Sequence, residues 1–240
     1  MKVDPGSLPE AGTLAFQLLG LVVAAVLRQR GHLIIHGAAA AAQGRALLVM
    51  GDSGAGKSTT LHTLLARGYA MLSDNFTALR RRPDGALEVL PGVPRMSLTR
   101  DSARRLGTDL SHHPKHPNAP QKNMLPTGTR MAPEPVELAL VCQLRSGQGD
   151  RLLVRAVEGS DKFVALTRCL YVGGVQHDPR VTMDMLAAAA GQSSFIQIER
   201  PSGRWCPDDI VEVLLREMAK PGAGAARPAG EKSTPPGNSG

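Results

Sequence analysis

Residues 47–75 read LLVMGDSGAGKSTTLHTLLARGYAMLSDN and contain the clearest motif of the sequence. A short apolar run leads into GDSGAGKS at 51–58, which matches the phosphate-binding pattern G-x-x-x-x-G-K-[ST] known as Walker A. A helix-forming segment follows the loop directly, so the motif has the strand–loop–helix setting in which it works. The stretch therefore predicts an α/β domain that holds a nucleotide at the start of a helix.

Each residue type in the loop has a physical reason. Gly51, Gly54 and Gly56 let the main chain turn tightly and aim its N–H groups inward, which forms a concave anion site. Lys57 adds a full charge at the β- and γ-phosphates, and the hydroxyl of Ser58 suits Mg²⁺. The alternative is a glycine turn before a helix, with Lys57 in solvent. The expected nucleotide-binding residues are Gly51, Asp52, Ser53, Gly54, Ala55, Gly56, Lys57, Ser58 and Thr59.

Asp74 lies seventeen residues beyond the loop lysine, after the apolar segment YAMLS. A metal-bound nucleotide needs a carboxylate near Mg²⁺ or near the attacking group, and the end of a strand beside the loop can supply one. We therefore expect ATP and Mg²⁺ as cofactors, with Ser58 and Asp74 as the metal ligands. The alternative is an aspartate that caps a helix or stabilises a turn.

Composition and charge narrow the possible partners. The chain has 240 residues, a net charge of +7 and only 3% aromatic residues, so its core must consist mainly of Leu, Val, Ala and Met. The arginines are scattered and no aromatic-rich basic module is evident, which argues against nucleic acid as the partner. The simplest interpretation of the net positive charge is a basic surface without a particular partner. The alternative is that part of this charge binds phosphate or an acidic partner.

Residues 14–27, LAFQLLGLVVAAVL, form the most apolar run. The run is shorter than the roughly 20 residues that span a bilayer, and no basic segment precedes it as in a signal peptide. We expect a buried helix, no membrane partner and a cytoplasmic location. Cys142, Cys169 and Cys206 are widely spaced and odd in number, so reduced thiols are expected.

The first half of the chain predicts regular elements at close intervals. Gln43 and Gly44 are expected to turn one strand into the next, and Pro-Asp-Gly at 83–85 is typical of a hairpin turn. The expected elements are an N-terminal helix at about 12–29, strands at 32–42 and 45–50, a helix at 57–68, a strand at 69–75 and a hairpin at 78–90. Residues 30–80 form the expected nucleotide-binding core.

The second half of the chain predicts its secondary structure less clearly than the first. Residues 111–130 are rich in Pro, His and Asn and predict a long irregular loop. The other expected elements are helices at 101–110, 161–174, 182–191 and 207–220, a strand at 193–200, and a second strand pair at 136–146 and 151–157. Residues 1–220 are expected to form a single domain, and residues 221–240, rich in Pro and Gly, a disordered tail.

Three linked features resemble the catalytic domain of HPr kinase/phosphorylase. The first is the pair His36 and Gly37 ahead of the loop, and the second is the motif GDSG-x-GKS within the loop. The third is the short interval from Lys57 to the pair Asp74 and Asn75, which follows the segment ARGY. The interval is the most discriminating feature, because most P-loop proteins place the second acidic strand much farther from the lysine. The resemblance covers about residues 14–80, extends to the phosphoenolpyruvate carboxykinase-like architecture, and is strongest to the shorter, single-domain relatives.

The resemblance implies a P-loop nucleoside triphosphate hydrolase-like fold, with a mixed central sheet and flanking helices. It implies an ATP-dependent serine kinase that transfers the γ-phosphoryl group to a protein or peptide, with a homo-oligomer possible. Asp74 would accept the hydroxyl proton, and His36 would lie near the transferred phosphate as a third catalytic residue beside Lys57. The alternative for His36 is a strand-end histidine bonded to a carbonyl.

The sequence departs from the family pattern at Asn75, where the family has a second aspartate. Asparagine brings no charge to Mg²⁺, so two further functions stay open: an ATP-binding regulatory or scaffold protein with weak catalysis, and an ATPase that uses water. Lys122 is expected to be an exposed loop lysine, with a phosphate contact as the alternative. His112, His113 and His116 are clustered, but intervening prolines argue against a metal site.

Overall fold

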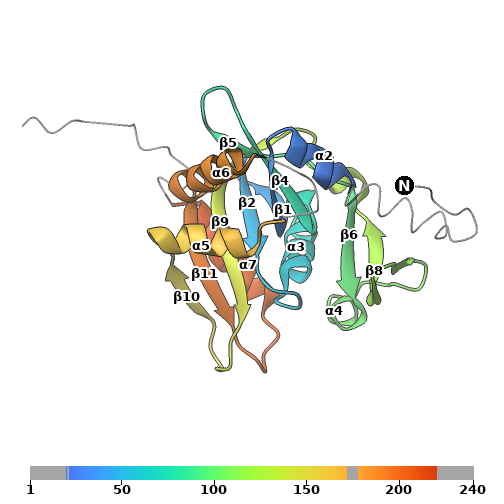
Figure 1. Cartoon of the computed structure of the whole chain (residues 1–240). Helices are drawn as coiled ribbons and strands as arrows, with labels where there is room; N and C mark the ends of the chain where they lie inside the picture. Colours follow the sequence, from blue (N-terminus) through green and yellow to red (C-terminus); the bar gives the residue numbers. More distant parts are fainter. Residues whose placement is uncertain (1–19, 21, 172–177, 221–240) are drawn as a thin grey trace, which may run out of the picture.

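The computed structural model describes residues 20, 22–171 and 178–220. Figure 1 shows a central mixed sheet with helices packed on it and a smaller sheet at one side. The elements are α2 (Val23–Gln29), β1 (Leu33–Ala42), β2 (Arg45–Met50), α3 (Lys57–Ala66), β3 (Ala70–Ser73), β4 (Phe76–Arg81), β5 (Leu87–Val89), β6 (Arg95–Thr99), α4 (Arg100–Arg105), β7 (Lys115–His116), β8 (Ala119–Pro126), η3 (Gly128–Arg130), β9 (Val136–Ser146), β10 (Leu153–Ala156), α5 (Ser160–Arg168), α6 (Pro179–Gln192), β11 (Ser194–Arg200) and α7 (Pro207–Met218).

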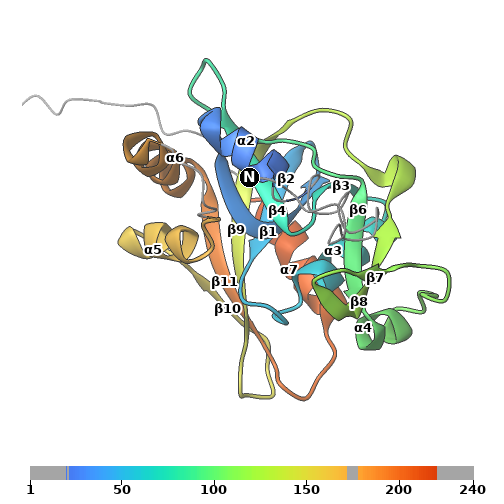
Figure 2. The same cartoon turned by 45° about the vertical axis from the view of Figure 1, so that its right-hand side comes forward.

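Within the described residues, eight strands form the central sheet, in the order β10-β11-β9-β2-β1-β4-β5 with β3 paired to β1. β2 runs parallel to β9, and β1 runs antiparallel to β2, so the sheet is mixed as expected. The smaller sheet has the order β6-β8-β7. In Figure 2 this smaller sheet lies on the same side of the molecule as α3 and α4.

β1 and β2 are apolar along nearly their whole length because both faces of the sheet are covered. Gln43 and Gly44 turn the chain between them with φ angles of 54° and 74°. Two successive positive φ angles characterise the type I′ turn, whose twist matches that of an antiparallel strand pair. The expected turn and both strands are confirmed, and β2 carries the chain into the glycine-rich loop.

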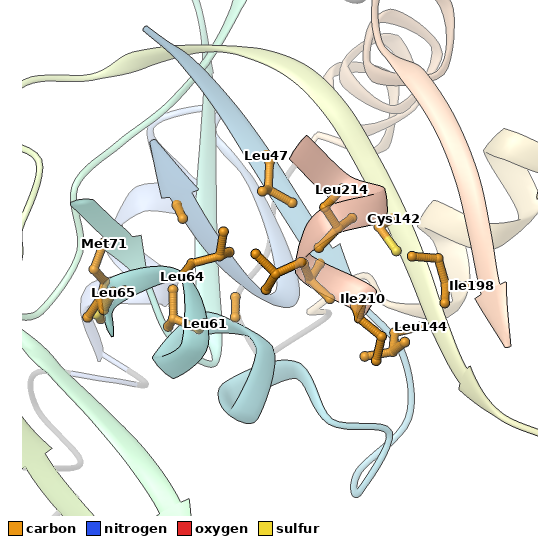
Figure 3. Close-up of a cluster of buried hydrophobic side chains, with 14 of the residues drawn as sticks. Leu47, Leu61, Leu64, Leu65, Met71, Cys142, Leu144, Ile198, Ile210 and Leu214 are labelled. Atoms are coloured by element: carbon orange, nitrogen blue, oxygen red, sulfur yellow. The ribbon is translucent and has the colours of Figure 1, made fainter. Parts of the chain in front are cut away.

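Two aliphatic cores lie on opposite faces of the sheet. One packs α3 and α7 against β2, β9 and β11, and the other packs α5 and α6 against the opposite face. Figure 3 shows the first core, in which Leu61 and Leu64 of α3 lie close to Ile210 and Leu214 of α7. This packing against the sheet and α7 holds α3, which begins at the glycine-rich loop.

The predicted helix at 57–68 is α3, which ends before Gly68 at a φ angle of 87°. The predicted hairpin at 78–90 is confirmed as β4 and β5, whose register pairs Arg81 with Leu87. The predictions at 182–191, 193–200 and 207–220 are confirmed as α6, β11 and α7, and the helix predicted at 101–110 is the shorter α4, which ends at Arg105. The pattern of apolar residues within each segment identifies these elements.

The prediction of an irregular loop over residues 111–130 is wrong. β7 and β8 lie in this range, and the second part of β8 pairs with β6, from Thr99 opposite Lys122 to Arg95 opposite Pro126. Few side chains of β8 are large and apolar, and its buried positions include Asn123, whose amide donates a hydrogen bond to the His113 carbonyl oxygen at 2.6 Å. Its stability therefore comes from pairing with β6 rather than from a pattern of its own.

Residues 136–146 and 151–157 contain strands β9 and β10, but these do not pair with each other as expected. β11 lies between them, antiparallel to β10 and parallel to β9. Strands that are neighbours in sequence pair only about two-thirds of the time, and a long crossover through α5 and α6 brings β11 into place here.

Two further predicted helices are shorter in the described residues. α5 ends at Arg168 rather than at 174, because Leu170 then bridges to Ile35 and Tyr171 N–H donates to the Ile34 carbonyl oxygen at 2.9 Å. Of the helix predicted at 12–29, α2 covers Val23–Gln29, and residues 12–19 and 21 lie outside the described residues. Residues 172–174 and the tail at 221–240 also lie outside them.

Cys142, Cys169 and Cys206 are free thiols, as expected. Among the described residues, no helix has both the length and the apolar character needed to cross a bilayer.

Candidate active site

The glycine-rich loop joins the end of β2 to the start of α3 through main-chain angles that require glycine. Gly51, Gly54 and Gly56 have φ angles of 147°, 83° and 113°. A Cβ atom on Gly51 would lie 2.1 Å from the Leu144 carbonyl oxygen of β9, far inside a van der Waals contact. The loop is thus held against the adjacent strand, and its concave side faces a cleft.

Lys57 is the first residue of α3, and its side chain bends back over the loop. Its Nζ donates hydrogen bonds to the carbonyl oxygens of Gly51 at 2.7 Å and Asp52 at 3.0 Å. Burial lowers the pKa of the Lys57 ammonium from its usual value, with the charge of Lys122 adding to the effect. The ammonium therefore does not extend into solvent, and it lies where phosphate oxygens could replace the two carbonyl oxygens.

Ser58 and Asp74, sixteen residues apart, meet at the mouth of the loop. Ser58 Oγ donates a hydrogen bond to Asp74 Oδ1 at 3.0 Å, and the Ser97 N–H of β6 donates to Asp74 Oδ2 at 2.9 Å. Burial raises the pKa of the Asp74 carboxyl above its usual value, although both hydrogen bonds and the charges of Lys122 and Lys57 oppose the shift. A carboxylate in this setting is a stronger base than an exposed aspartate.

His36 and Asn75 adjoin Asp74 in the cleft. Burial, reinforced by the charges of Lys57 and Lys122, lowers the pKa of His36 to about 4, so its imidazole is neutral at pH 7. A hydrogen bond to the Asn75 main chain opposes that shift. In this form His36 can orient an acceptor through a hydrogen bond.

Asn75 has a φ angle of 80°, a conformation that asparagine tolerates better than most residues. Its carbonyl oxygen accepts a hydrogen bond from the Gly37 N–H at 3.1 Å. The main chain after Asp74 therefore turns back towards β1, which keeps the Asp74 carboxylate at the loop.

The cleft has a volume of about 580 Å³ and is mainly cationic. Of the predicted nucleotide-binding residues, Ser53, Gly54, Gly56, Lys57, Ser58 and Thr59 line it, as do Asp74 and His36. Gly51, Asp52 and Ala55 do not line it; Gly51 and Ala55 are buried and Asp52 is exposed. Its charged lining consists of Lys57, Lys122, Arg105, Arg200 and Arg204 against Asp74 and Asp101. Such an excess of positive charge attracts a polyanion.

Arg200, the last residue of β11, was not predicted from the sequence. Its Nε donates a hydrogen bond to the Ala55 carbonyl oxygen at 2.9 Å, and its Nη2 donates to the Gly54 carbonyl oxygen at 3.1 Å. These contacts fix the outer side of the loop from a strand 145 positions away in sequence. The one feature of the sequence that could have indicated this role is the charge of Arg200 at the end of the strand predicted at 193–200.

Lys122 lies on β8 and lines the cleft, so the expectation of an exposed loop lysine is wrong. Burial lowers the pKa of both His36 and His116, and the charge of Lys122 adds to each shift. His116 of β7 also lines the cleft, whereas His112 and His113 do not. The pairing of β8 with β6 carries Lys122 to this position.

Arg105 of α4 and Trp205 form another part of the wall. The Arg105 guanidinium lies over the Trp205 ring, 5.2 Å from its centroid, and 38% of Trp205 is exposed. Thr59 Oγ1 donates a hydrogen bond to Ser102 Oγ at 3.1 Å, which ties α3 to α4. A flat ring stacked with a cation beside an anion site is suited to contact a nucleobase.

The oxygen atoms of Ser58 and Asp74 fit Mg²⁺, which prefers hard oxygen ligands and in nucleotide enzymes takes one or two from the protein, with water and phosphate supplying the others. No cluster of three or more His, Cys, Asp or Glu side chains suited to a metal occurs among residues 20, 22–171 and 178–220. The pair is therefore suited to a metal that arrives with a nucleotide.

No protein-family model matches the sequence, and no curated protein matches it. Among the solved structures that match is the Hpr(Ser) kinase/phosphatase from Coxiella burnetii, at 13% sequence identity. The match covers 76% of this chain and 88% of that chain, with a TM-score of 0.41. Because this likeness is loose, the chemistry of the cleft must be argued from its own residues.

Proposed function

We propose that the protein is an ATP-dependent serine kinase that transfers the γ-phosphoryl group of ATP to a serine hydroxyl of a protein or peptide. The observation that carries the proposal is the contact between Ser58 and Asp74, which brings the strand-end carboxylate to the phosphate-binding loop beside Lys57. The proposal includes a cytoplasmic location, where ATP is available, and no nucleic-acid partner. A homo-oligomer is compatible with it.

The loop amides and the Lys57 ammonium would hold the polyphosphate, and this positioning supplies most of the catalysis in phosphoryl transfer. Mg²⁺ held by Ser58 and Asp74 would neutralise charge on the phosphates. The serine Oγ forms a bond to the γ-phosphorus as the bond from that phosphorus to the β,γ-bridging oxygen breaks, and ADP leaves. The hydroxyl proton passes to the Asp74 carboxylate, whose raised pKa favours the transfer.

Nucleotide binding and phosphoryl transfer can be measured separately. Trp205 is the single tryptophan of the chain and lines the cleft, so its fluorescence should change when Mg·ATP binds. Transfer is measured by incubation with Mg·ATP and a degenerate pool of serine peptides, followed by detection of phosphoserine by mass spectrometry. We expect both signals. Phosphate release into water with no phosphoserine in any peptide would support an ATPase instead.

Asn75 favours a second candidate, an ATP-binding regulatory or scaffold protein with weak catalysis, because an amide adds no charge at the metal. The variant Asn75→Asp distinguishes the two. Aspartate also tolerates a positive φ angle, so thermal unfolding should be unchanged. If Asp74 and Ser58 suffice, the transfer rate should change by less than about threefold. A rise of about tenfold or more in the single-turnover rate would favour the regulatory protein.

A further inference from the structure

A second cavity, of about 420 Å³, adjoins the cleft at the proposed catalytic carboxylate. Asp74, Asn75, Ser97 and His116 line both spaces. No residue of the glycine-rich loop lines the second cavity within the described part of the chain. The Asp74 carboxylate thus lies between a cationic cleft and a separate space on its other side.

The wall of the second cavity is mostly apolar. α2, β1, β4 and the segment after β5 contribute Val23, Leu27, Ile34, Phe76, Leu90 and Val93. The small side chains of Ala24 and Ala78 also line it, which leaves room between the larger ones. The edge contact of the Phe76 ring with Tyr171, at 4.8 Å between centroids, holds that ring in place.

The polar groups of this cavity gather where it meets the cleft. Beside the shared residues it has one further charged side chain, Arg95 of β6, whose charge contributes to lowering the pKa of His116 and which therefore lies near that ring. The cavity thus has a polar end at Asp74 and an apolar remainder. Its volume falls within the range of about 300–1,000 Å³ typical of ligand sites.

We propose that this second cavity is the acceptor site, and that the acceptor is a peptide segment whose serine is followed or preceded by a large apolar side chain. The inference rests on the proposed kinase function. In phosphoryl transfer the attacking and leaving oxygens lie roughly in line, so the acceptor must approach from the side opposite ADP. A space that reaches Asp74 without touching the loop meets this requirement.

The division of the cavity into two parts accounts for the composition of the acceptor. The serine hydroxyl occupies the polar end, within reach of Asp74, and the neighbouring apolar side chain fills the remainder. Burial of a side chain the size of Leu or Phe gives a substantial gain in free energy, which an Asp or Gly neighbour would not provide. Peptides with an apolar neighbour are therefore selected at the step of acceptor binding.

Two valines of α2 provide a matched test. Val23 and Val26 are 42% and 39% exposed, and only Val23 lines the cavity. Serine peptides with Leu or Phe beside the serine are compared with peptides that have Asp or Gly there. For the wild type we expect kcat/KM to be about 10- to 100-fold higher for the apolar set. Val23→Glu should remove this preference through a higher KM, whereas Val26→Glu should keep it.

The outcomes separate this inference from the function on which it rests. ATP binding detected through Trp205 with no phosphoserine in any peptide would reject the kinase and the inference together. Phosphoserine formed without regard to the neighbouring residue would reject only the inference, as would a preference that survives Val23→Glu. A change in oligomeric mass or a lower unfolding temperature for Val23→Glu but not for Val26→Glu would assign the cavity to a second copy or to the chain itself, and would also reject it.

Discussion

Replacement of Lys57 by alanine is expected to abolish measurable ATP binding and turnover. The ammonium already makes two hydrogen bonds at the loop, to the Gly51 and Asp52 carbonyl oxygens, and it would exchange them for phosphate oxygens. Each hydrogen bond to a charged group contributes about 1.5–3 kcal/mol, so the loss of two should weaken ATP binding by about 100-fold or more. Titration of Trp205 fluorescence with Mg·ATP measures the effect.

The stability of Lys57→Ala tests whether Lys57 contributes to the stability of the folded protein. Lys57 is the first residue of α3, where a positive charge faces the positive end of the helix dipole, and alanine is the better helix former. This gain opposes the loss of the hydrogen bonds to the Gly51 and Asp52 carbonyl oxygens, so the free energy of unfolding should change little. Lys115→Ala, at an exposed position outside the cleft, is the control and should bind ATP normally. Normal ATP binding by Lys57→Ala would contradict the assignment.

Asp74→Asn should leave ATP binding within about threefold of wild type and lower the transfer rate by about 10²- to 10⁴-fold, the usual contribution of a general base. The amide oxygen of asparagine can still accept the hydrogen bond from the Ser97 N–H, and its NH2 group can donate to Ser58 Oγ, so the local structure is kept. Asparagine cannot take the hydroxyl proton. Single-turnover phosphoserine formation measures transfer, and Asp109→Asn, at an exposed turn outside the cleft, is the control.

The same residue predicts the pH dependence of transfer. Burial raises the pKa of the Asp74 carboxyl, and a base must be deprotonated to act. The transfer rate should therefore fall as the pH falls through the pKa of Asp74, and this acidic limb should be absent from the residual activity of Asp74→Asn. Full transfer by Asp74→Asn across the pH range would refute the role of Asp74.

The sequence predicted those parts of the site that lie close together along the chain. The loop, the helix after it and the strand before Asp74 follow from glycine spacing and apolar runs within residues 47–75. Ser58 and Asp74 were expected to lie together as metal ligands because the end of a strand beside the loop can supply a carboxylate. In the structure β3 follows α3 and pairs with β1, and the two side chains are in contact.

The sequence did not predict the contributions of distant segments. Arg200 reaches the loop because β11 lies parallel to β9, and Lys122 reaches the cleft because β8 pairs with β6. Both pairings depend on residues far apart in the chain. In addition, β8 has too few apolar side chains to be recognised as a strand from its sequence. The cavity between α2 and β4 likewise needs three-dimensional packing to be seen.

The hydrogen bond from the Ser97 N–H to Asp74 has a consequence for how position 74 should be probed. It joins β6, and with it the smaller sheet, to the strand end that precedes the base. Alanine at position 74 would leave that N–H without a hydrogen-bond acceptor. It would also remove a contact between the two sides of the cleft. The lower activity of an alanine variant would then combine two effects, the loss of the contact with β6 and the loss of the catalytic carboxylate. The isosteric variant Asp74→Asn separates these two effects.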